Sequence, residues 1–157
     1  FMFLIHVGYP NADEEMDIMR RGTEGTSEKP QAVLNAEQLV YMQEVVKSLP
    51  VSEHVYGYAR AIVRSTRPKE EEALEITNKY LRFGAGPRAS LALITAAKAH
   101  ALINGRVYVA CENIAAVAPS ILRHRIAPNF AAQSEGISSD DLVRQILAEI
   151  PQHEAHS

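Results

Sequence analysis

The sequence contains no tryptophan and a single cysteine among its 157 residues. One cysteine cannot form an internal disulfide, which is typical of a reducing compartment, so we expect a cytoplasmic protein. No uninterrupted apolar run approaches the roughly 20 residues that span a bilayer. Phe1 to Ile5 is apolar but short, and no basic leader precedes it. We therefore expect no signal peptide and no membrane partner.

Several catalytic motifs are also missing. The chain has no G-x-x-x-x-G-K-[ST] and no Gly-Lys pair, which excludes phosphate binding by a P-loop. Asp13-Glu14 does not follow the hydrophobic strand that a Walker-type acidic pair requires, and no G-x-S-x-G elbow exists. Cys111 has no cationic neighbour in sequence, so we expect a packing residue. Six dispersed histidines without close ligand spacing predict no metal site. No catalytic residue is expected in this chain.

What the sequence does contain is typical of one globular domain. The composition is 46% hydrophobic and 22% charged, and the formal net charge is −3. That charge gives no general attraction to nucleic acid, so we do not expect nucleic acid as a partner.

Helical patterns dominate the chain. Asn11 and Asn35 are predicted N-caps, the second within a capping box with Gln38, and Ser52 is the predicted cap of a third helix. The last helix is predicted to begin at Ser138 or Ser139 and to end before Pro151. The third helix should bury one apolar face, made of Val55, Tyr58, Ala59, Ile62 and Val63.

Two further helices lie between these. Ala89 to Ile103 is apolar in nearly every direction, including Leu91 and Ile103, which predicts a helix buried among the others and closed by Asn104-Gly105. The helix around Ile114 to Leu122 contains Pro119, which should break or kink it.

Extended segments are few. We expect Phe1 to Val7 to be a strand that pairs with a larger protein, with another copy, or locally with Val107 to Val109. Six helices and one or two short strands predict a mainly α bundle.

The segment from Gly84 to Ser90 places a cation where a long helix begins. A helix start offers unpaired N–H groups and a positive dipole end, Pro87 suits the first helical position, and Arg88 adds a planar donor fork. Gly84, Gly86 and Pro87 would shape this loop. The alternative is an ordinary turn with a solvated arginine. Thr95 and Lys98 extend a narrow polar face from Arg88 along the same helix.

A second basic surface is predicted on the third helix. Arg60, Arg64 and Arg67 share one face at helical spacing, which is typical of a solvated surface, although such a face can also contact phosphate or a neighbouring subunit. Together with Arg123-His124-Arg125, these residues support an alternative function, a stand-alone helical module that binds protein or nucleic acid.

From Phe1 to about Ile150, the chain resembles the C-terminal part of the MoxR-type AAA+ ATPases. The order and spacing of four segments carry this resemblance: Phe1-Met2-Phe3 leading to Tyr9-Pro10, Val33 to Glu37, Gly84 to Leu93, and Ala118 to Arg125. In that family the P-loop, Walker B acids, sensor 1 and arginine finger precede the equivalent of Phe1.

The resemblance implies a helical AAA+ lid domain over residues 11–151, after a last core strand over residues 1–10 and before a tail over residues 152–157. It implies that Arg88 is a sensor 2 arginine for the γ-phosphate of ATP, with Thr95, Lys98, Arg60 and Arg64 as candidate secondary contacts. ATP and Mg²⁺ are implied for the full-length protein and not for this part alone.

Implied partners are the AAA+ core domain of the same protein, neighbouring subunits of a homo-oligomeric ring and a client protein. A protein with a von Willebrand factor A domain is a further partner implied by the family, whose work is chaperone-like and includes regulation of methanol dehydrogenase. The chain departs from the family pattern at two places. Ala110 to Asn113 lacks a capping hydroxyl, and Lys69 to Tyr80 is an insertion, which we interpret as a tolerated surface loop rather than a contact surface.

Overall fold

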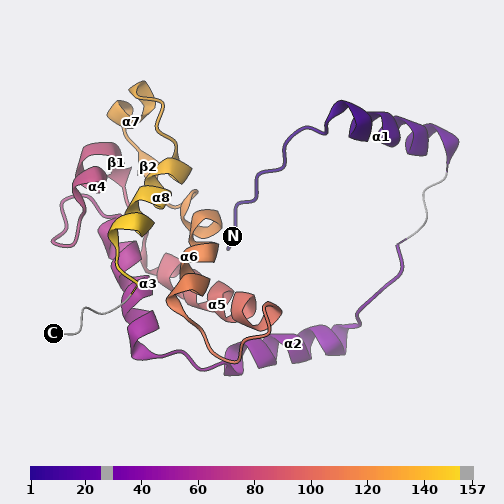
Figure 1. Cartoon of the computed structure of the whole chain (residues 1–157), viewed down its shortest axis with the longest axis horizontal. Helices are drawn as coiled ribbons and strands as arrows, with labels where there is room; N and C mark the ends of the chain where they lie inside the picture. The colour runs from indigo at the N-terminus through magenta and orange to yellow at the C-terminus, as the bar shows by residue number, and fades with distance from the viewer. Residues whose placement is uncertain (26–29, 153–157) are drawn as a thin grey trace.

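The computed structural model describes residues 1–25 and 30–152, and this part of the chain is mainly helical (Figure 1). The helices are α1 (Ala12–Glu24), α2 (Ala36–Ser48), α3 (Glu53–Ser65), α4 (Glu75–Tyr80), α5 (Pro87–Ile103), α6 (Cys111–Leu122), α7 (Phe130–Ser134) and α8 (Ser139–Glu149). Strands β1 (Leu81–Phe83) and β2 (Ala127–Pro128) pair antiparallel, with Leu81 opposite Pro128 and Phe83 opposite Ala127. The predicted α class is confirmed.

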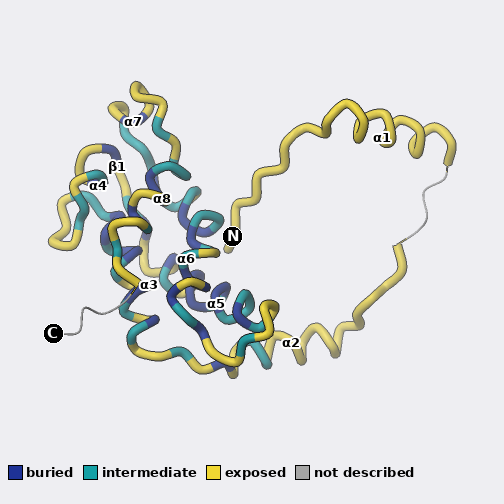
Figure 2. The backbone as a smooth tube through the Cα atoms, viewed as in Figure 1, coloured by how far each residue is buried: buried dark blue, intermediate teal, exposed yellow. Residues whose placement is uncertain are grey.

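The hydrophobic core lies between α3, α5, α6 and α8 (Figure 2). All five predicted core residues of α3 are buried, as its amphipathic spacing requires. Helix α5 is central, and five of its buried residues are alanines, whose small side chains allow close packing against α6. Two predictions for α5 were wrong, because Leu91 is 69% exposed and Ile103 is 85% exposed.

The predicted helix starts are mostly confirmed. Asn11, Asn35 and Ser138 each accept a hydrogen bond from a first-turn backbone N–H, and each closes a capping box. At the end of α5, Gly105 has a φ of 72°, the left-handed cap that the Asn-Gly pair predicts. Pro119 does not end α6, which continues through it to Leu122. Pro119 lies in the last turns of the helix, where its missing backbone N–H removes only one intrahelical hydrogen bond.

The segment from Lys69 to Tyr80 is not simply a surface loop, so that interpretation was wrong. Its second half forms α4, where Thr77 is fully buried and Tyr80 is 9% exposed. The Thr77 hydroxyl donates a hydrogen bond to the carbonyl oxygen of Ser65, and Tyr80 Oη donates one to Glu135, both at 2.7 Å. The segment therefore contributes to the packing of the bundle.

The predicted N-terminal strand is not formed within the described residues. Residues 1–10 are extended and exposed, have no sheet partner, and lead to α1, which stands away from the bundle (Figures 1 and 2). Leu4 N–H donates to the carbonyl oxygen of Ser120 at 2.8 Å, and Arg125 donates to that of Phe1 at 2.6 Å. The alternative of a local pairing with Val107 to Val109 is excluded, because that segment forms no strand.

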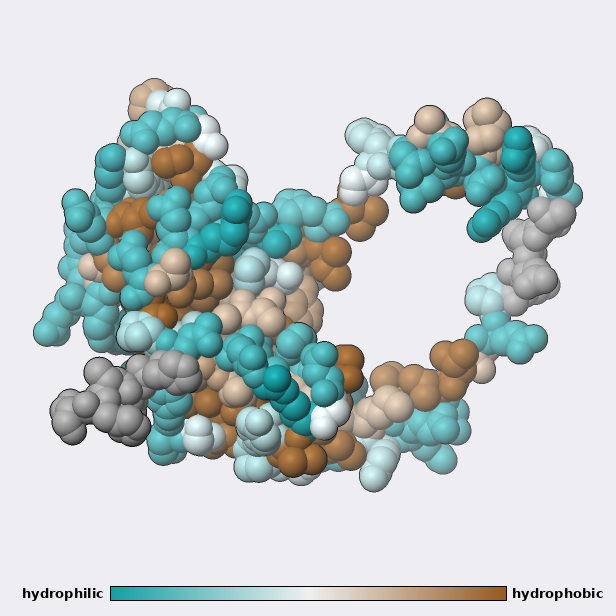
Figure 3. All heavy atoms as spheres, viewed as in Figure 1, coloured by the Kyte–Doolittle hydropathy of each residue, from teal (hydrophilic) through white to brown (hydrophobic). Residues whose placement is uncertain are grey.

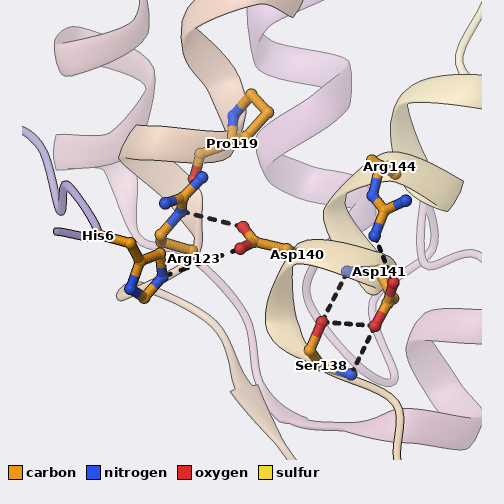
Figure 4. A network of polar contacts seen from close by, with 7 residues as sticks. All are labelled: His6, Pro119, Arg123, Ser138, Asp140, Asp141 and Arg144. Carbon is orange, nitrogen blue, oxygen red and sulfur yellow. Dashed lines mark hydrogen bonds and ion pairs between the residues drawn. The ribbon is translucent and has the colours of Figure 1, made fainter. Parts of the chain in front are cut away.

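Residues 1–48 expose much of their apolar surface. No residue of α1 or α2 is buried, and hydrophobic side chains lie on the outside of this arm (Figure 3). A small polar network includes His6 of the arm and residues of the bundle (Figure 4). Arg123 lies 2.9 Å from a carboxylate oxygen of Asp140 and donates to the carbonyl oxygen of Pro119, while His6 lies 3.9 Å from the other Asp140 oxygen. Within the described residues no helix has the length and apolar character needed to cross a membrane.

Candidate functional site

The strongest candidate site is the start of α5. This 17-residue helix begins at Pro87, and its N-cap residue is Gly86, which has no side chain to cap it. Arg88 is exposed, and no residue in the described part of the chain forms a hydrogen bond or ion pair with its side chain. The first turn of α5 contains no acidic residue. A guanidinium next to the positive end of a helix dipole is unfavourable alone, so an anion bound there would be doubly stabilised.

The loop before Arg88 is held by the end of α3. The backbone N–H of Ala85 donates to Thr66 Oγ1, and Arg67 Nε donates to the carbonyl oxygen of Ala85, both at 2.9 Å. Gly84 lies so close to α3 that an added Cβ would be 2.2 Å from the carbonyl oxygen of Thr66. Of the predicted loop-shaping residues, Gly84 therefore permits a close approach, Gly86 precedes the helix, and Pro87 begins it.

The predicted secondary contacts differ from Arg88 in their surroundings. The Thr95 hydroxyl donates to the carbonyl oxygen of Leu91, within the same helix. The Lys98 ammonium donates to the carbonyl oxygen of Lys47 at 2.8 Å and so satisfies a carbonyl at the end of α2. Arg60 is exposed. Thr95, Lys98 and Arg60 all line one groove of about 580 Å³ between α2, α3 and α5. Its other lining residues are largely apolar: Val46, Lys47, Tyr56, Ala59, Ser90, Leu91 and Ile94.

Arg64 is occupied by acidic residues of the following segment. Its Nε lies 2.5 Å from Glu72, and one terminal nitrogen lies 3.5 Å from Glu70. The hydrogen bond from Arg64 lowers the pKa of Glu72 below its ordinary value of 4.5, and the same bond raises the pKa of Arg64. Arg64 is therefore already paired with acidic residues of the segment after α3.

The basic residues of the alternative module mostly have partners within the chain. Arg67 is bonded to Ala85, Arg123 to Pro119 and Asp140, and Arg125 to Phe1. A guanidinium that is already paired has little to gain from a phosphate, because it would first lose its existing contact. The geometry of these arginines gives the nucleic-acid hypothesis no support.

Cys111 is buried at 7% exposure, as predicted for a packing residue. Burial raises the pKa of its thiol above the ordinary value of 9.0, which disfavours the reactive thiolate. Its Sγ lies 3.3 Å from His54 Nε2, a neighbour that the sequence did not indicate because 57 residues separate the two. Among the described residues no group of three or more His, Cys, Asp or Glu side chains could hold a metal ion.

Thr66 was not identified from the sequence, and Arg67 was identified only as part of a basic face. Both lie in a Ser-Thr-Arg-Pro segment typical of any helix end. Their contact with Ala85 depends on how α3 and α5 pack, and no local pattern indicates it.

The family model of the AAA lid domain matches residues 73–146. The chain is 34% identical over 148 residues to the chaperone MoxR1 of Mycobacterium tuberculosis, covering 94% of this chain. It is 30% identical over 151 residues to the Bacillus subtilis protein YeaC, covering 96% of this chain. A crystal structure of a candidate ATPase from Cytophaga hutchinsonii aligns over 98% of the chain with a TM-score of 0.86 and 32% identity.

These relatives are longer than this chain. It spans 39% of MoxR1, 44% of YeaC and 47% of the Cytophaga protein. The similarity includes the extended arm as well as the bundle, because nearly the whole chain aligns with the Cytophaga structure.

Proposed function

Residues 73–146 are an AAA lid domain in a chain homologous over nearly its whole length to a MoxR chaperone, and on this premise we propose that Arg88 senses the γ-phosphate of ATP. One observation carries the proposal. Arg88 is an exposed guanidinium with no partner among the described residues, at the positive end of a long helix, on a loop that neighbouring residues hold in place. These features favour an anion with several oxygens.

The sensing step follows from the difference between ATP and ADP. With ATP bound by an AAA+ core, Arg88 makes charge-assisted hydrogen bonds to the terminal phosphate. After hydrolysis that phosphate leaves, and Arg88 loses its partner. The free energy of the lost contact then changes the preferred orientation of the lid relative to the core.

ATP would contribute the reactive phosphoanhydride, with Mg²⁺ to neutralise its charge. The residues of this chain fit the phosphate end of that ligand, because the start of α5 presents a cation and an uncapped helix end. The proposed partners are the core domain, neighbouring subunits of a ring and a client protein, whose assembly or maturation the motion drives in the cytoplasm. A protein with a von Willebrand factor A domain is a further proposed partner.

The test is ATP turnover by a polypeptide that contains this chain together with its ATPase core. Arg88→Ala is expected to lower kcat by about a hundredfold, with a smaller change in KM, because the contact stabilises the charge that develops on the phosphate. Arg88→Lys keeps the charge and loses the planar fork, so an intermediate loss is expected.

Arg82→Ala is the matched control. Arg82 is also exposed and lies six residues earlier, but its guanidinium stacks on the ring of Phe83, 4.8 Å from its centroid, rather than facing an anion site. Turnover should be unchanged in this variant. Normal turnover in Arg88→Ala would overturn the proposed function.

A further inference from the structure

We propose that Thr66 and Arg67 are positioning residues, which hold Arg88 where it can contact a nucleotide phosphate. The inference rests on the function proposed above and assigns a role to the end of α3 in that function. Neither side chain needs to touch the nucleotide, since each acts on the backbone of Ala85, three residues before Arg88.

The Thr66 hydroxyl has a fixed orientation. It donates to the carbonyl oxygen of Val63 at 2.6 Å and accepts from the N–H of Ala85 at 2.9 Å. The hydroxyl thus uses its donor on a backbone group of α3 and one of its acceptor positions on a backbone group of the loop before α5. Thr66 is fully buried and Ala85 is 1% exposed, so water cannot replace these bonds easily.

Arg67 completes the attachment from the other side of the same residue. Its Nε donates to the carbonyl oxygen of Ala85, so both backbone polar groups of Ala85 are bound to the two residues that follow α3. Such a bond from a charged donor is stronger than a neutral one. Gly84 adds a steric constraint, because its backbone lies directly against that of Thr66 and Arg67.

The distance along the chain from this attachment to Arg88 is short. Only Gly86 and Pro87 intervene, and the proline ring fixes one of the dihedral angles between them. On the inner side of the helix, Ala89 is fully buried, which fixes the rotation of the first turn. Rigid attachment matters because a misplacement of about 1 Å can cost roughly a hundredfold in rate.

The end of α3 is itself held by the segment that follows it. Thr77 donates to the carbonyl oxygen of Ser65, and Arg64 pairs with Glu72. The residues that orient Arg88 therefore rest on α4 and the charged stretch before it.

The test is a double-mutant cycle in the polypeptide that contains this chain and its ATPase core. Arg67→Ala and Thr66→Val are each expected to lower kcat about tenfold, with KM for ATP changing less than about twofold. Thr66→Ser retains the hydroxyl and should recover most of the turnover that Thr66→Val loses. In the Arg88→Ala background, neither substitution should lower kcat further, because no guanidinium remains to be positioned.

A second readout does not require turnover. In the 157-residue chain, Thr66→Val should accelerate hydrogen exchange of the Ala85 amide by about tenfold, because its acceptor is lost. Exchange of the Leu4 amide is the internal control. Its acceptor is the carbonyl oxygen of Ser120, which Thr66→Val does not alter, so this exchange rate should not change.

The outcomes separate this inference from the proposed function. If Arg67→Ala lowers kcat by the same factor in the unaltered and Arg88→Ala backgrounds, its effect is independent of Arg88. That result would overturn the positioning role alone. Unchanged exchange at Ala85 in Thr66→Val would also overturn it. Normal turnover in Arg88→Ala would overturn both proposals.

Discussion

The side-chain hydroxyl of Thr77 donates a 2.7 Å hydrogen bond to the carbonyl oxygen of Ser65, and both residues are buried. This bond joins α4 to the last residue of α3, whose carbonyl would otherwise have no intrahelical donor. A segment that appears from sequence to be an insertion is thus tied to the core.

Thr77→Val is therefore expected to destabilise the chain by about 1–3 kcal/mol, since it keeps the side-chain volume and leaves the buried Ser65 carbonyl without this donor. Urea unfolding of the 157-residue chain measures the change, with an unaltered m-value. Thr77→Ser retains the hydroxyl and should lose less. Equal stability of Thr77→Val and the unaltered chain would show that the bond contributes nothing.

Local signals predicted the six longer helices, whereas the short helices α4 and α7 were not predicted. The buried face of α3 follows from apolar spacing, and the caps at Asn11, Asn35 and Ser138 follow from residue type. Each of these depends on residues within one or two turns, which is the range that sequence patterns describe.

The errors occurred where tertiary contacts decide the structure. Leu91 is apolar but exposed, because it borders the groove beside α2 instead of the core. Strand β1 has only three residues, and its partner lies more than forty residues further along the chain. Phe1 to Val7 has strand composition, and its predicted pairing with a larger protein or another copy involves no described residue of this chain, so that pairing stays a prediction.

Only part of the candidate site was predicted from the sequence, because tertiary contacts determine the rest. Arg88 was identifiable because glycine, proline and arginine at a helix start form a local pattern. The attachment of Ala85 to Thr66 and Arg67 was not, because it joins residues 18 and 19 positions apart through two single hydrogen bonds.

Gly84 and Gly86 provide a matched pair of substitutions. A methyl group at position 84 would meet the backbone of Thr66 and Arg67, so Gly84→Ala must separate the loop from α3 and should cost about 1–3 kcal/mol. At position 86 a Cβ meets nothing within 4 Å, and the φ of −85° suits any residue. Gly86→Ala should therefore change stability by less than about 1 kcal/mol.

Thermal unfolding of the two variants checks this expectation. The difference between them is the informative quantity, because both substitutions add the same methyl group. A Gly86→Ala variant that is as unstable as Gly84→Ala would mean that the loop is not held against α3.

The start of α8 should become less stable in acid. Asp141 accepts hydrogen bonds from the Ser138 hydroxyl and from the Ser138 N–H, and these bonds, with the charge of Arg144, lower its pKa below the ordinary value of 3.8. A carboxyl group whose pKa is lower in the folded state contributes stability at pH values above 3.8. That contribution is lost as the pH falls through the folded-state pKa, because the unfolded chain takes up the proton more readily.

Asp141→Asn removes this titration, so the loss of stability between neutral pH and pH values below 3.8 should be smaller than in the unaltered chain. Urea unfolding across this pH range measures the difference. Asp17→Asn in α1 is the control for removing one carboxylate elsewhere, since Asp17 is exposed on a helix that buries no residue. If Asp141→Asn and the unaltered chain lose stability in parallel, the capping box of α8 does not contribute to the acid sensitivity.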